Sequence, residues 1–280
     1  DFQDYFGNTI AGNFEAYQLH IVPEEVEDFR YTINRVKDIL KEGGAVIGAA
    51  AFPSDDVAFL AGSGFDFLLF DTQHAPVEIK ELGPCIRSMR GAEGVPIVRV
   101  GENRADQICY ALDQGAKGIV VPMVNSAKEA EDMVRWCKYP FDGVRSSAGM
   151  SGDWGDFASY REYMDAVNEQ LLVVPMIETV EALDAIEEIL AVKGIDVLLI
   201  GPSDLSINLD VALDYTNSKY QDALDRIAEA SINAGVVPGL YFVPPGLEPK
   251  GLIERGFRFF TLPWRGWAKE GIKAGLELTK

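Results

Sequence analysis

The chain has 280 residues, of which 48% are hydrophobic and 10% aromatic, and its formal net charge at pH 7 is −19. A chain of this length can form one large domain, and its negative charge argues against nucleic acid or an anionic membrane surface as a partner. No apolar run approaches the roughly 18 residues that would span a bilayer, so no membrane partner is expected.

The N-terminus lacks a basic segment followed by an apolar one, so it does not predict a secretory signal. Residues 1–37 are expected to form an N-terminal extension, with a helix near 26–40. Cys85, Cys109 and Cys137 are widely spaced, which fits neither a disulfide framework nor a structural zinc site. Inert thiols in a reducing compartment are the better interpretation, and the expected location is the cytoplasm.

Short apolar runs then alternate with amphipathic stretches along the chain. Eight runs are predicted as strands: 45–52, 65–70, 95–100, 118–123, 171–178, 196–201, 237–242 and 257–262. Helical patterns lie between them, and several end on glycine, as helix C-termini prefer: Gly91, Gly115, Gly194 and Gly235.

Eight such units with strands apolar on both faces predict an α/β fold, a (β/α)8 TIM barrel over residues 38–280. A doubly wound open sheet is the alternative, but no GxGxxG turn follows the first strand. The longest insertion, residues 140–165, is rich in glycine, serine and aromatic residues. Such a segment is often a lid or substrate wall, and the alternative is a surface excursion.

Barrel enzymes place their chemistry at the carboxyl ends of the strands, where five chargeable residues are expected to meet. These are Asp71 and His74 after the second strand, Arg99 in the third, Glu178 after the fifth and Asp204 after the sixth. Each also has a structural interpretation: Arg99 could pair with Asp71, Glu178 and Asp204 could cap helices, and Asp71 and His74 could form a turn. The presence of five chargeable residues at the same end of the barrel favours a functional site.

Glu178 and Asp204 suit a hard divalent cation such as Mg²⁺ or Mn²⁺, which often relies on one or two protein carboxylates. Zinc is disfavoured because His74 is the only histidine of the predicted barrel; His20 lies in the extension.

The remaining three residues suggest how the site would handle charge and protons. Arg99 can bind a carboxylate or stabilise an enolate oxygen, and His74, oriented by Asp71, can transfer a proton. Lysine is absent from the strand ends, since Lys117 and Lys193 precede their strands, so a Schiff-base mechanism lacks its nucleophile. The sequence therefore predicts metal-stabilised enolate chemistry.

A set of ordered motifs resembles the HpcH/HpaI aldolase family over roughly residues 38–265. The motifs are "FDFLLFDTQHAP", "PIVRV", "GIVVPMVNSAKEAE", "YPFDGVRS", "MIETVEAL" and "GIDVLLIGPSDLS". The resemblance implies a class II, metal-dependent pyruvate aldolase, typified by 2,4-dihydroxyhept-2-ene-1,7-dioate aldolase. Mg²⁺ is the implied ion, with Mn²⁺ or Co²⁺ as alternatives, and the implied substrate is a small-molecule 2-oxo acid.

The resemblance also implies roles for individual residues. Glu178 and Asp204 match the two metal ligands, Arg99 matches the arginine that contacts the pyruvyl oxygen, and Asp71 and His74 match a proton-relaying pair. The backbone N–H of Ser203 would help to hold the pyruvate carboxylate.

Two further implications concern assembly. Asp113 aligns with an acidic residue that, in the family, reaches a neighbouring subunit's site. Family members are typically hexamers built from dimers that exchange a C-terminal helix, so residues 266–280 are expected at a subunit interface of a homo-oligomer.

Two positions expected to face the substrate depart from the family pattern. Gln73 stands where the family often has an acidic residue before the catalytic histidine, and Met176 stands where it often has glutamine two residues before the metal-binding glutamate. The loss of that amide removes a polar contact to the substrate and makes the pocket drier. Both departures bear on which substrate the site accepts.

The leading hypothesis is a lyase that cleaves or forms 4-hydroxy-2-oxo acids through a metal-bound pyruvate enolate, releasing or consuming an aldehyde. The alternative is an oxaloacetate decarboxylase, or an enzyme like macrophomate synthase, that directs the same enolate to another acceptor. Trp154, Phe157, Tyr160, Trp264 and Trp267 could frame a bulky acceptor, although ordinary packing is the simpler interpretation. A non-catalytic ligand-binding barrel would predict a lost site residue, and none is lost.

Overall fold

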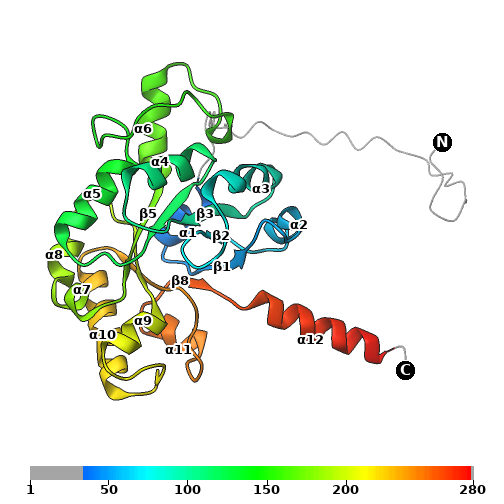
Figure 1. Cartoon of the computed structure of the whole chain (residues 1–280), viewed down its shortest axis with the longest axis vertical. Coiled ribbons are helices and arrows are strands. Elements are labelled where there is room, and N and C mark those ends of the chain that lie inside the picture. The colour runs from blue at the N-terminus through cyan, green and yellow to red at the C-terminus, as the bar shows by residue number, and fades with distance from the viewer. Residues whose placement is uncertain (1–33, 279–280) are drawn as a thin grey trace, which may run out of the picture. The chain divides into compact units, whose positions relative to one another are not determined.

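The structure, a computed structural model, describes residues 34–278, and within them eight parallel strands close into a barrel. The strands are hydrogen-bonded in chain order, and β8 closes the ring against β1. Figure 1 shows the helices arranged around these strands. The predicted (β/α)8 fold is therefore confirmed, and the open doubly wound sheet is excluded.

The strands match the predicted apolar runs to within two residues at each end. They are β1 Val46–Ala51, β2 Phe67–Asp71, β3 Val95–Arg99, β4 Gly118–Val121, β5 Leu172–Ile177, β6 Val197–Ile200, β7 Val237–Leu240 and β8 Phe259–Thr261.

The helices cover the outside of the barrel. They are α1 Arg35–Lys41, α2 Val57–Ala61, α3 Leu82–Ser88, α4 Ala105–Asp113, α5 Ala127–Cys137, α6 Tyr160–Gln170, α7 Val180–Asp184, α8 Ile186–Leu190, α9 Pro202–Asn208, α10 Ser218–Asn233, α11 Pro249–Glu254 and α12 Trp264–Glu277. Short 3₁₀ turns occupy Ile79–Glu81 and Gly152–Trp154. The four glycines predicted to end helices all have positive φ, the conformation that a helix C-terminus often requires.

Side chains alternate along each strand between the barrel interior and the helix layer. This alternation divides the core into an outer cluster under the helices and an inner cluster within the barrel. Inside, the rings of Phe67 and Phe259 stack with centroids 4.3 Å apart. Gly48 provides the space for this stack, because a Cβ atom there would overlap the ring of Phe67. The interior is therefore a packed core and leaves the chemistry to the strand ends.

Helix α1 closes the N-terminal end of the barrel. Val36 is fully buried and belongs to the inner cluster. The Nζ of Lys37 donates to the carbonyl oxygen of Glu169 at 2.6 Å and lies 2.8 Å from the carboxylate of Asp196. The boundary expected between residues 37 and 38 thus falls inside this helix. Residues 1–33 of the expected extension, with His20 and most of its predicted helix, lie outside the described residues.

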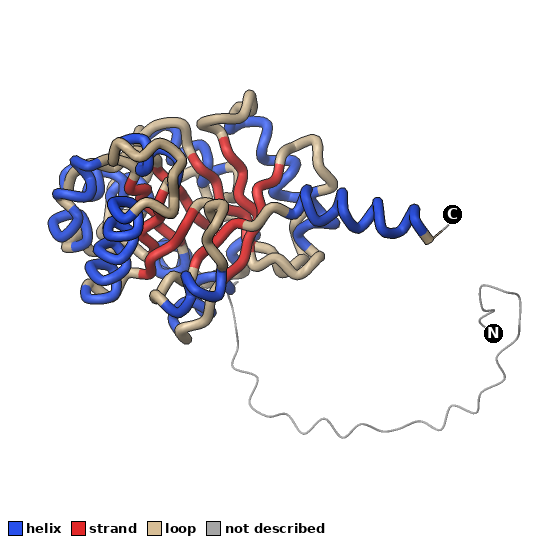
Figure 2. The backbone as a smooth tube through the Cα atoms, turned by 90° about the horizontal axis from the view of Figure 1, so that it is seen from below, coloured by secondary structure: helices blue, strands red, loops and turns tan. Residues whose placement is uncertain are grey.

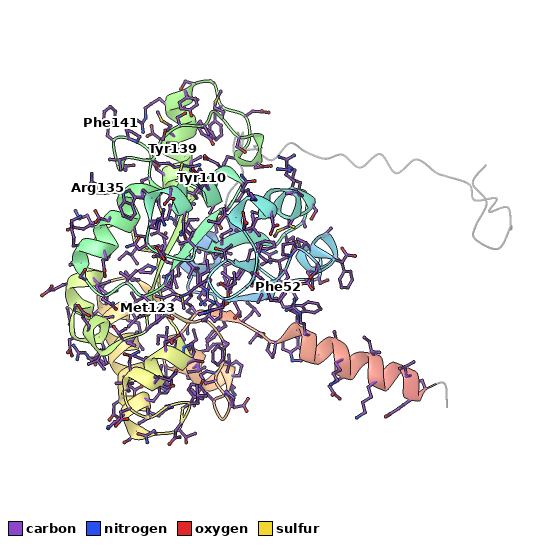
Figure 3. All side chains as sticks on the ribbon, viewed as in Figure 1. Phe52, Tyr110, Met123, Arg135, Tyr139 and Phe141 are labelled. Carbon is purple, nitrogen blue, oxygen red and sulfur yellow. The ribbon has the colours of Figure 1, made fainter. Side chains whose placement is uncertain are left out.

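The insertion considered as a lid is not at the carboxyl ends of the strands, so that expectation is wrong. It connects α5 to β5, and such a connection leads to the N-terminal end of the next strand. The Nζ of Lys117, which precedes β4, lies 5.0 Å from the ring centroid of Trp154. Figure 3 likewise shows Tyr139 and Phe141 apart from Phe52 and Met123, which follow β1 and β4.

The aromatic residues of this insertion pack against one another. Trp154, Phe157 and Tyr160 contact a cluster that also contains Tyr139 and Tyr163. Ordinary packing is therefore the correct interpretation for these three residues, and they frame no acceptor at the strand ends.

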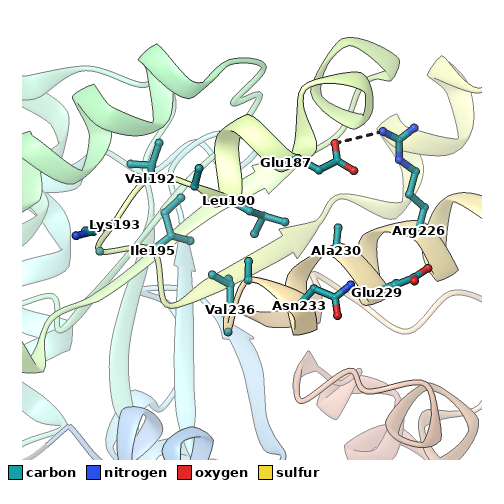
Figure 4. A pocket seen from close by; sticks show the side chains of 14 residues that line it. Glu187, Leu190, Val192, Lys193, Ile195, Arg226, Glu229, Ala230, Asn233 and Val236 are labelled. Atoms are coloured by element: carbon teal, nitrogen blue, oxygen red, sulfur yellow. Dashed lines mark hydrogen bonds and ion pairs between the residues drawn. The ribbon is translucent and has the colours of Figure 1, made fainter.

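Two cavities also belong to the N-terminal side of the barrel. One of about 840 Å³ lies between α8 and α10, lined by residues that lead into β6 and β7 (Figure 4). Another, of about 680 Å³, is lined by Lys117 and Asp153. Within residues 34–278, no helix combines the length and apolarity needed to cross a membrane.

Helix α12 has no buried residue, and Figures 1 and 2 show it extending away from the barrel after β8. Its first turn is fixed, because Trp264 Nε1 donates to the carbonyl oxygen of Ala50 at 2.9 Å and Arg265 stacks over the ring of Phe52. Beyond that turn, Trp267 and Ile272 are large apolar side chains with exposed fractions of 53% and 64%. Such exposure is typical of a surface that contacts a partner.

The hydroxyl of Tyr220 in α10 gives a prediction about stability, because it is buried and has no hydrogen-bond partner within residues 34–278. An unpaired buried hydroxyl costs about 1–3 kcal/mol. Tyr220→Phe should therefore raise the free energy of unfolding by about 1 kcal/mol, which corresponds to an increase in Tm of about 2–4 °C. Thermal unfolding followed by circular dichroism measures the change, and a lower Tm would contradict the prediction.

Candidate active site

Three predicted site residues lie at inward positions at the carboxyl ends of their strands. Asp71, Arg99 and Glu178 each follow, two residues later, a side chain of the inner cluster, namely Leu69, Ile97 and Met176. Because the side-chain direction repeats every two residues, all three point into the mouth of the barrel. The two-residue repeat of side-chain direction thus brings three residues that are distant in the sequence to the same end of the barrel interior.

Asp71 and Arg99 form a buried ion pair across two neighbouring strands. Their Cα atoms are partners in the β2–β3 ladder. Arg99 Nε donates to Asp71 Oδ1 at 2.9 Å, and Arg99 Nη2 donates to Oδ2. The side chains are only 4% and 11% exposed for Arg99 and Asp71 respectively. The structural interpretation of this pair is therefore correct, and the pair also fixes the guanidinium at the strand ends.

Asp71 also organises the turn that carries His74. Its Oδ1 accepts from the backbone N–H of Gln73 at 2.9 Å and from that of His74 at 3.4 Å. Burial alone would raise the pKa of Asp71, but the hydrogen bonds and charge of Arg99 and these two N–H groups bring it below its usual value. Asp71 is therefore an anion that holds the His74 backbone, whereas the sequence predicted that it would orient the imidazole.

Glu178 interacts electrostatically with the other predicted charges of the site. Its side chain is almost fully buried, and Oε2 accepts the backbone N–H of Met123 at 2.7 Å. Burial raises the pKa of Glu178, and the negative charge of Asp204 raises it further; the N–H of Met123, the charge of Arg99 and the neighbouring His74 lower it. The net shift is upward. Groups from four separate segments therefore act on this carboxyl group.

Two backbone features shape the space around Glu178. Met123 adopts φ 55°, a left-handed conformation that residues other than glycine rarely take, and this conformation accompanies the hydrogen bond to Glu178. Gly201 lies beside Glu178, and a Cβ atom there would come within 2.7 Å of Glu178 Cγ and 2.8 Å of Cδ. Glycine at position 201 is therefore required by the position of the glutamate side chain.

Glu178 and Asp204 form a donor set that fits a hard divalent cation. Asp204 lies in the first turn of α9, and within residues 34–278 its carboxylate has no recorded hydrogen-bond donor. The repulsion between the two carboxylates is the kind that a bound dication relieves. Among the described residues no group of three or more His, Cys, Asp or Glu lies so that it could hold a metal.

Sequence analysis missed Tyr241, which follows β7. Arg99 Nη2 donates to its hydroxyl at 3.0 Å, and this hydroxyl lies 3.4 Å from Asp71 Oδ2. Its ring centroid lies 4.0 Å from Arg99 Cζ. The sequence analysis assigned no site residue to the end of this strand. The two-residue period would have indicated Tyr241, because it lies at the inward position two residues after Gly239.

The other expected substrate contacts lie near the same group. Met176 Sδ is 3.9 Å from Arg99 Nη1, and the buried Oε1 of Gln73 has no hydrogen-bond partner among the described residues. Ser203 occupies the second position of α9, where a backbone N–H has no acceptor within the helix.

Three other residues discussed in the sequence analysis lie away from this group of side chains. Asp113, at the end of α4, pairs within its own chain with Arg145, whose Nη2 is 3.0 Å from Asp113 Oδ1. Lys117 and Lys193 precede β4 and β6, as expected, and line cavities at the opposite end of the barrel.

Comparisons with known proteins identify the family of this chain. A sequence model of the family described as HpcH/HpaI aldolase/citrate lyase matches residues 53–264. A hydroxypyruvate/pyruvate aldolase from Roseovarius nubinhibens is 35% identical over 210 residues, which are 73% of this chain and 82% of that protein. A 4-hydroxy-2-oxo-heptane-1,7-dioate aldolase from Escherichia coli is 32% identical over 231 residues, covering 82% and 88% respectively.

A solved structure shows the same fold. An HpcH/HpaI aldolase/citrate lyase family protein from Burkholderia cenocepacia superposes with a TM-score of 0.78 at 27% identity, and the match covers 88% of this chain and 99% of that one.

Gly201→Ala tests whether the space around Glu178 matters for metal binding. The new methyl group should displace the glutamate side chain and weaken Mn²⁺ binding about tenfold or more, a typical effect when a metal ligand is misoriented. Isothermal titration with Mn²⁺ measures the affinity, and circular dichroism verifies the fold. Gly251→Ala is the matched control, because no atom lies within 4 Å of its Cβ position. Unchanged Mn²⁺ affinity in Gly201→Ala would contradict the assignment of Glu178 as a ligand.

Proposed function

Because this chain belongs to the HpcH/HpaI aldolase/citrate lyase family, we propose that it is a pyruvate aldolase that cleaves or forms 4-hydroxy-2-oxo acids. The products of cleavage are pyruvate and an aldehyde. One observation carries the proposal beyond the family: Asp71, Arg99 and Glu178 lie at inward positions at the carboxyl ends of their strands, and the Asp71 carboxylate also holds the turn that carries His74. Acidic ligands, a fixed cation and an imidazole are the groups that enolate chemistry requires.

Glu178 and Asp204 would hold the divalent ion, which we propose is Mg²⁺, with Mn²⁺ or Co²⁺ as alternatives. When bound, such an ion polarises a carbonyl oxygen and offsets the negative charge that develops on it. The two carboxylates leave other coordination positions to water and substrate, as Mg²⁺ sites commonly do.

Arg99 supplies the fixed positive charge. Its guanidinium is held by Asp71 before any substrate arrives, so little reorganisation is needed when negative charge grows on the substrate oxygen. The backbone N–H of Ser203 is proposed to bind the carboxylate of the 2-oxo acid. Gln73 Oε1, a buried acceptor without a partner in the described part of the chain, is proposed to accept a hydrogen bond from the substrate.

In the cleavage direction, His74 accepts the proton of the 4-hydroxyl group, directly or through water. The bond between C3 and C4 breaks, its electron pair passes to C3 and gives the enolate of pyruvate, and the aldehyde departs. A proton delivered to C3 then completes pyruvate. Asp71 contributes by holding both Arg99 and the backbone of His74, so one carboxylate positions the cation and the proton carrier.

Exchange of the pyruvate C3 protons with deuterium from the solvent tests this proposal without knowledge of the aldehyde. Arg99→Ala and Glu178→Ala should each reduce the exchange at least about 10²-fold, since each removes charge stabilisation of the enolate. EDTA should abolish exchange, and added Mg²⁺ should restore it. Proton NMR in D₂O follows the reaction. Arg135→Ala and Glu187→Ala, which remove exposed side chains of the same types, are the controls. Full exchange activity in EDTA would refute the metal role.

We further propose that α12 contributes to contacts between copies in a homo-oligomer, a hexamer assembled from dimers. Its exposed apolar side chains and the absence of buried residues along it support this role. Trp267→Glu combined with Ile272→Glu should lower the oligomer mass measured by size-exclusion chromatography with light scattering. Glu270→Gln on the same helix is the control. A monomeric wild type, or an unchanged mass in the double variant, would contradict the proposal.

A further inference from the structure

The hydrogen bonds of Arg99 leave one edge of its guanidinium available. An arginine side chain has five N–H donors in a fixed plane. Nε donates to Asp71 Oδ1, and Nη2 donates to Asp71 Oδ2 and to the Tyr241 hydroxyl. These contacts use three donors. Within residues 34–278, Nη1 has only the thioether of Met176, at 3.9 Å, and a thioether is a weak acceptor.

Tyr241 contacts the guanidinium in two ways. Its hydroxyl accepts from Nη2, and its ring centroid lies 4.0 Å from Cζ, within the range of a cation–π contact. Burial raises the pKa of Tyr241 to about 12, so the hydroxyl keeps its proton at neutral pH. The hydroxyl can therefore accept from Arg99 and donate to Asp71 Oδ2 at 3.4 Å at the same time.

These contacts restrict how Arg99 can turn. The carboxylate of Asp71 binds the edge of the guanidinium formed by Nε and Nη2, and the Tyr241 hydroxyl also binds Nη2. A swing of the guanidinium plane away from Asp71 breaks both sets of contacts. The edge that faces away from Asp71, which carries Nη1, therefore stays on the side of Met176, which precedes Glu178 by two residues in the sequence.

We propose that Tyr241 is a positioning residue that keeps the Nη1 edge of Arg99 turned toward the substrate oxygen. This inference rests on the proposed function for its catalytic consequence, but the restriction of Arg99 is a property of the protein alone. Tyr241 itself does not exchange a proton with the substrate. Its hydroxyl acts through Arg99, so its removal should weaken the stabilisation of the enolate more than the binding of pyruvate.

Tyr241→Phe keeps the ring over the guanidinium and removes only the hydroxyl. We expect kcat for pyruvate proton exchange to fall about tenfold, the usual consequence of losing one hydrogen bond to a charged group, with KM changed by less than about threefold. Tyr220→Phe is the matched control, because it removes a buried hydroxyl that has no partner. Activity of Tyr241→Phe equal to that of the wild type would overturn the inference.

A double-mutant cycle separates positioning from a general effect on the fold. If the hydroxyl acts through Arg99, Tyr241→Phe should change kcat less than about twofold in the Arg99→Lys background, because the guanidinium that it positions is already absent. An undiminished tenfold loss in that background would show that the hydroxyl acts by another route, and would overturn the inference.

A third measurement does not depend on activity. In protein labelled with ¹⁵N-arginine, NMR reports rotation of the Arg99 guanidinium about its Cζ–Nε bond. This rotation should become several-fold faster in Tyr241→Phe and stay unchanged in Tyr220→Phe. If the wild type shows no pyruvate exchange, the proposed function fails while this measurement still decides the role of Tyr241. Equal rotation rates in wild type and Tyr241→Phe would overturn the inference even where exchange occurs.

Discussion

A carboxylate and a guanidinium meet at the inner ends of β2 and β3, where both side chains are almost completely removed from water. Removing charges from water is expensive, and only close pairing with further hydrogen bonds compensates for that cost. Asp71 and Arg99 meet this condition through two bonds to each other, two backbone N–H groups on the carboxylate and the hydroxyl of Tyr241 on the guanidinium. Loss of either partner would leave an unpaired buried charge, which typically costs about 3–5 kcal/mol.

This pair determines what the neighbouring acidic groups can do. The chain carries a net charge of −19, and Glu178 is buried close enough to Asp204 to be affected by its charge. Without compensation, two such carboxylates repel each other and weaken the fold. The positive charge of Arg99 reduces that repulsion, and a bound dication would reduce it further. The arrangement is typical of an active site, where buried charged groups that lower the stability of the fold are retained because the function needs them.

The two ends of the barrel are built differently. At the N-terminal end, α1 inserts Val36 into the inner cluster, and the long insertion adds an aromatic cluster around Tyr163. The carboxyl end carries Asp71, Arg99, Glu178 and Tyr241. The stack of Phe67 on Phe259 fills the barrel between the two ends. A closed and well-packed base of this kind gives the charged residues above it a rigid support, which fixed electrostatic groups need in order to act on a substrate.

The sequence by itself determined the eight strands, the barrel and most of the charged residues at its carboxyl end, because apolar runs and their spacing follow directly from burial. It also favoured a metal over a Schiff base, since lysine precedes the strands rather than following them. Only the tertiary structure decided the partners. It placed Tyr241 against Arg99, directed Asp71 to the backbone of His74, and put residues 140–165 at the opposite end. The contact between Tyr241 and Arg99 joins residues 142 positions apart, and local patterns do not encode such a pairing.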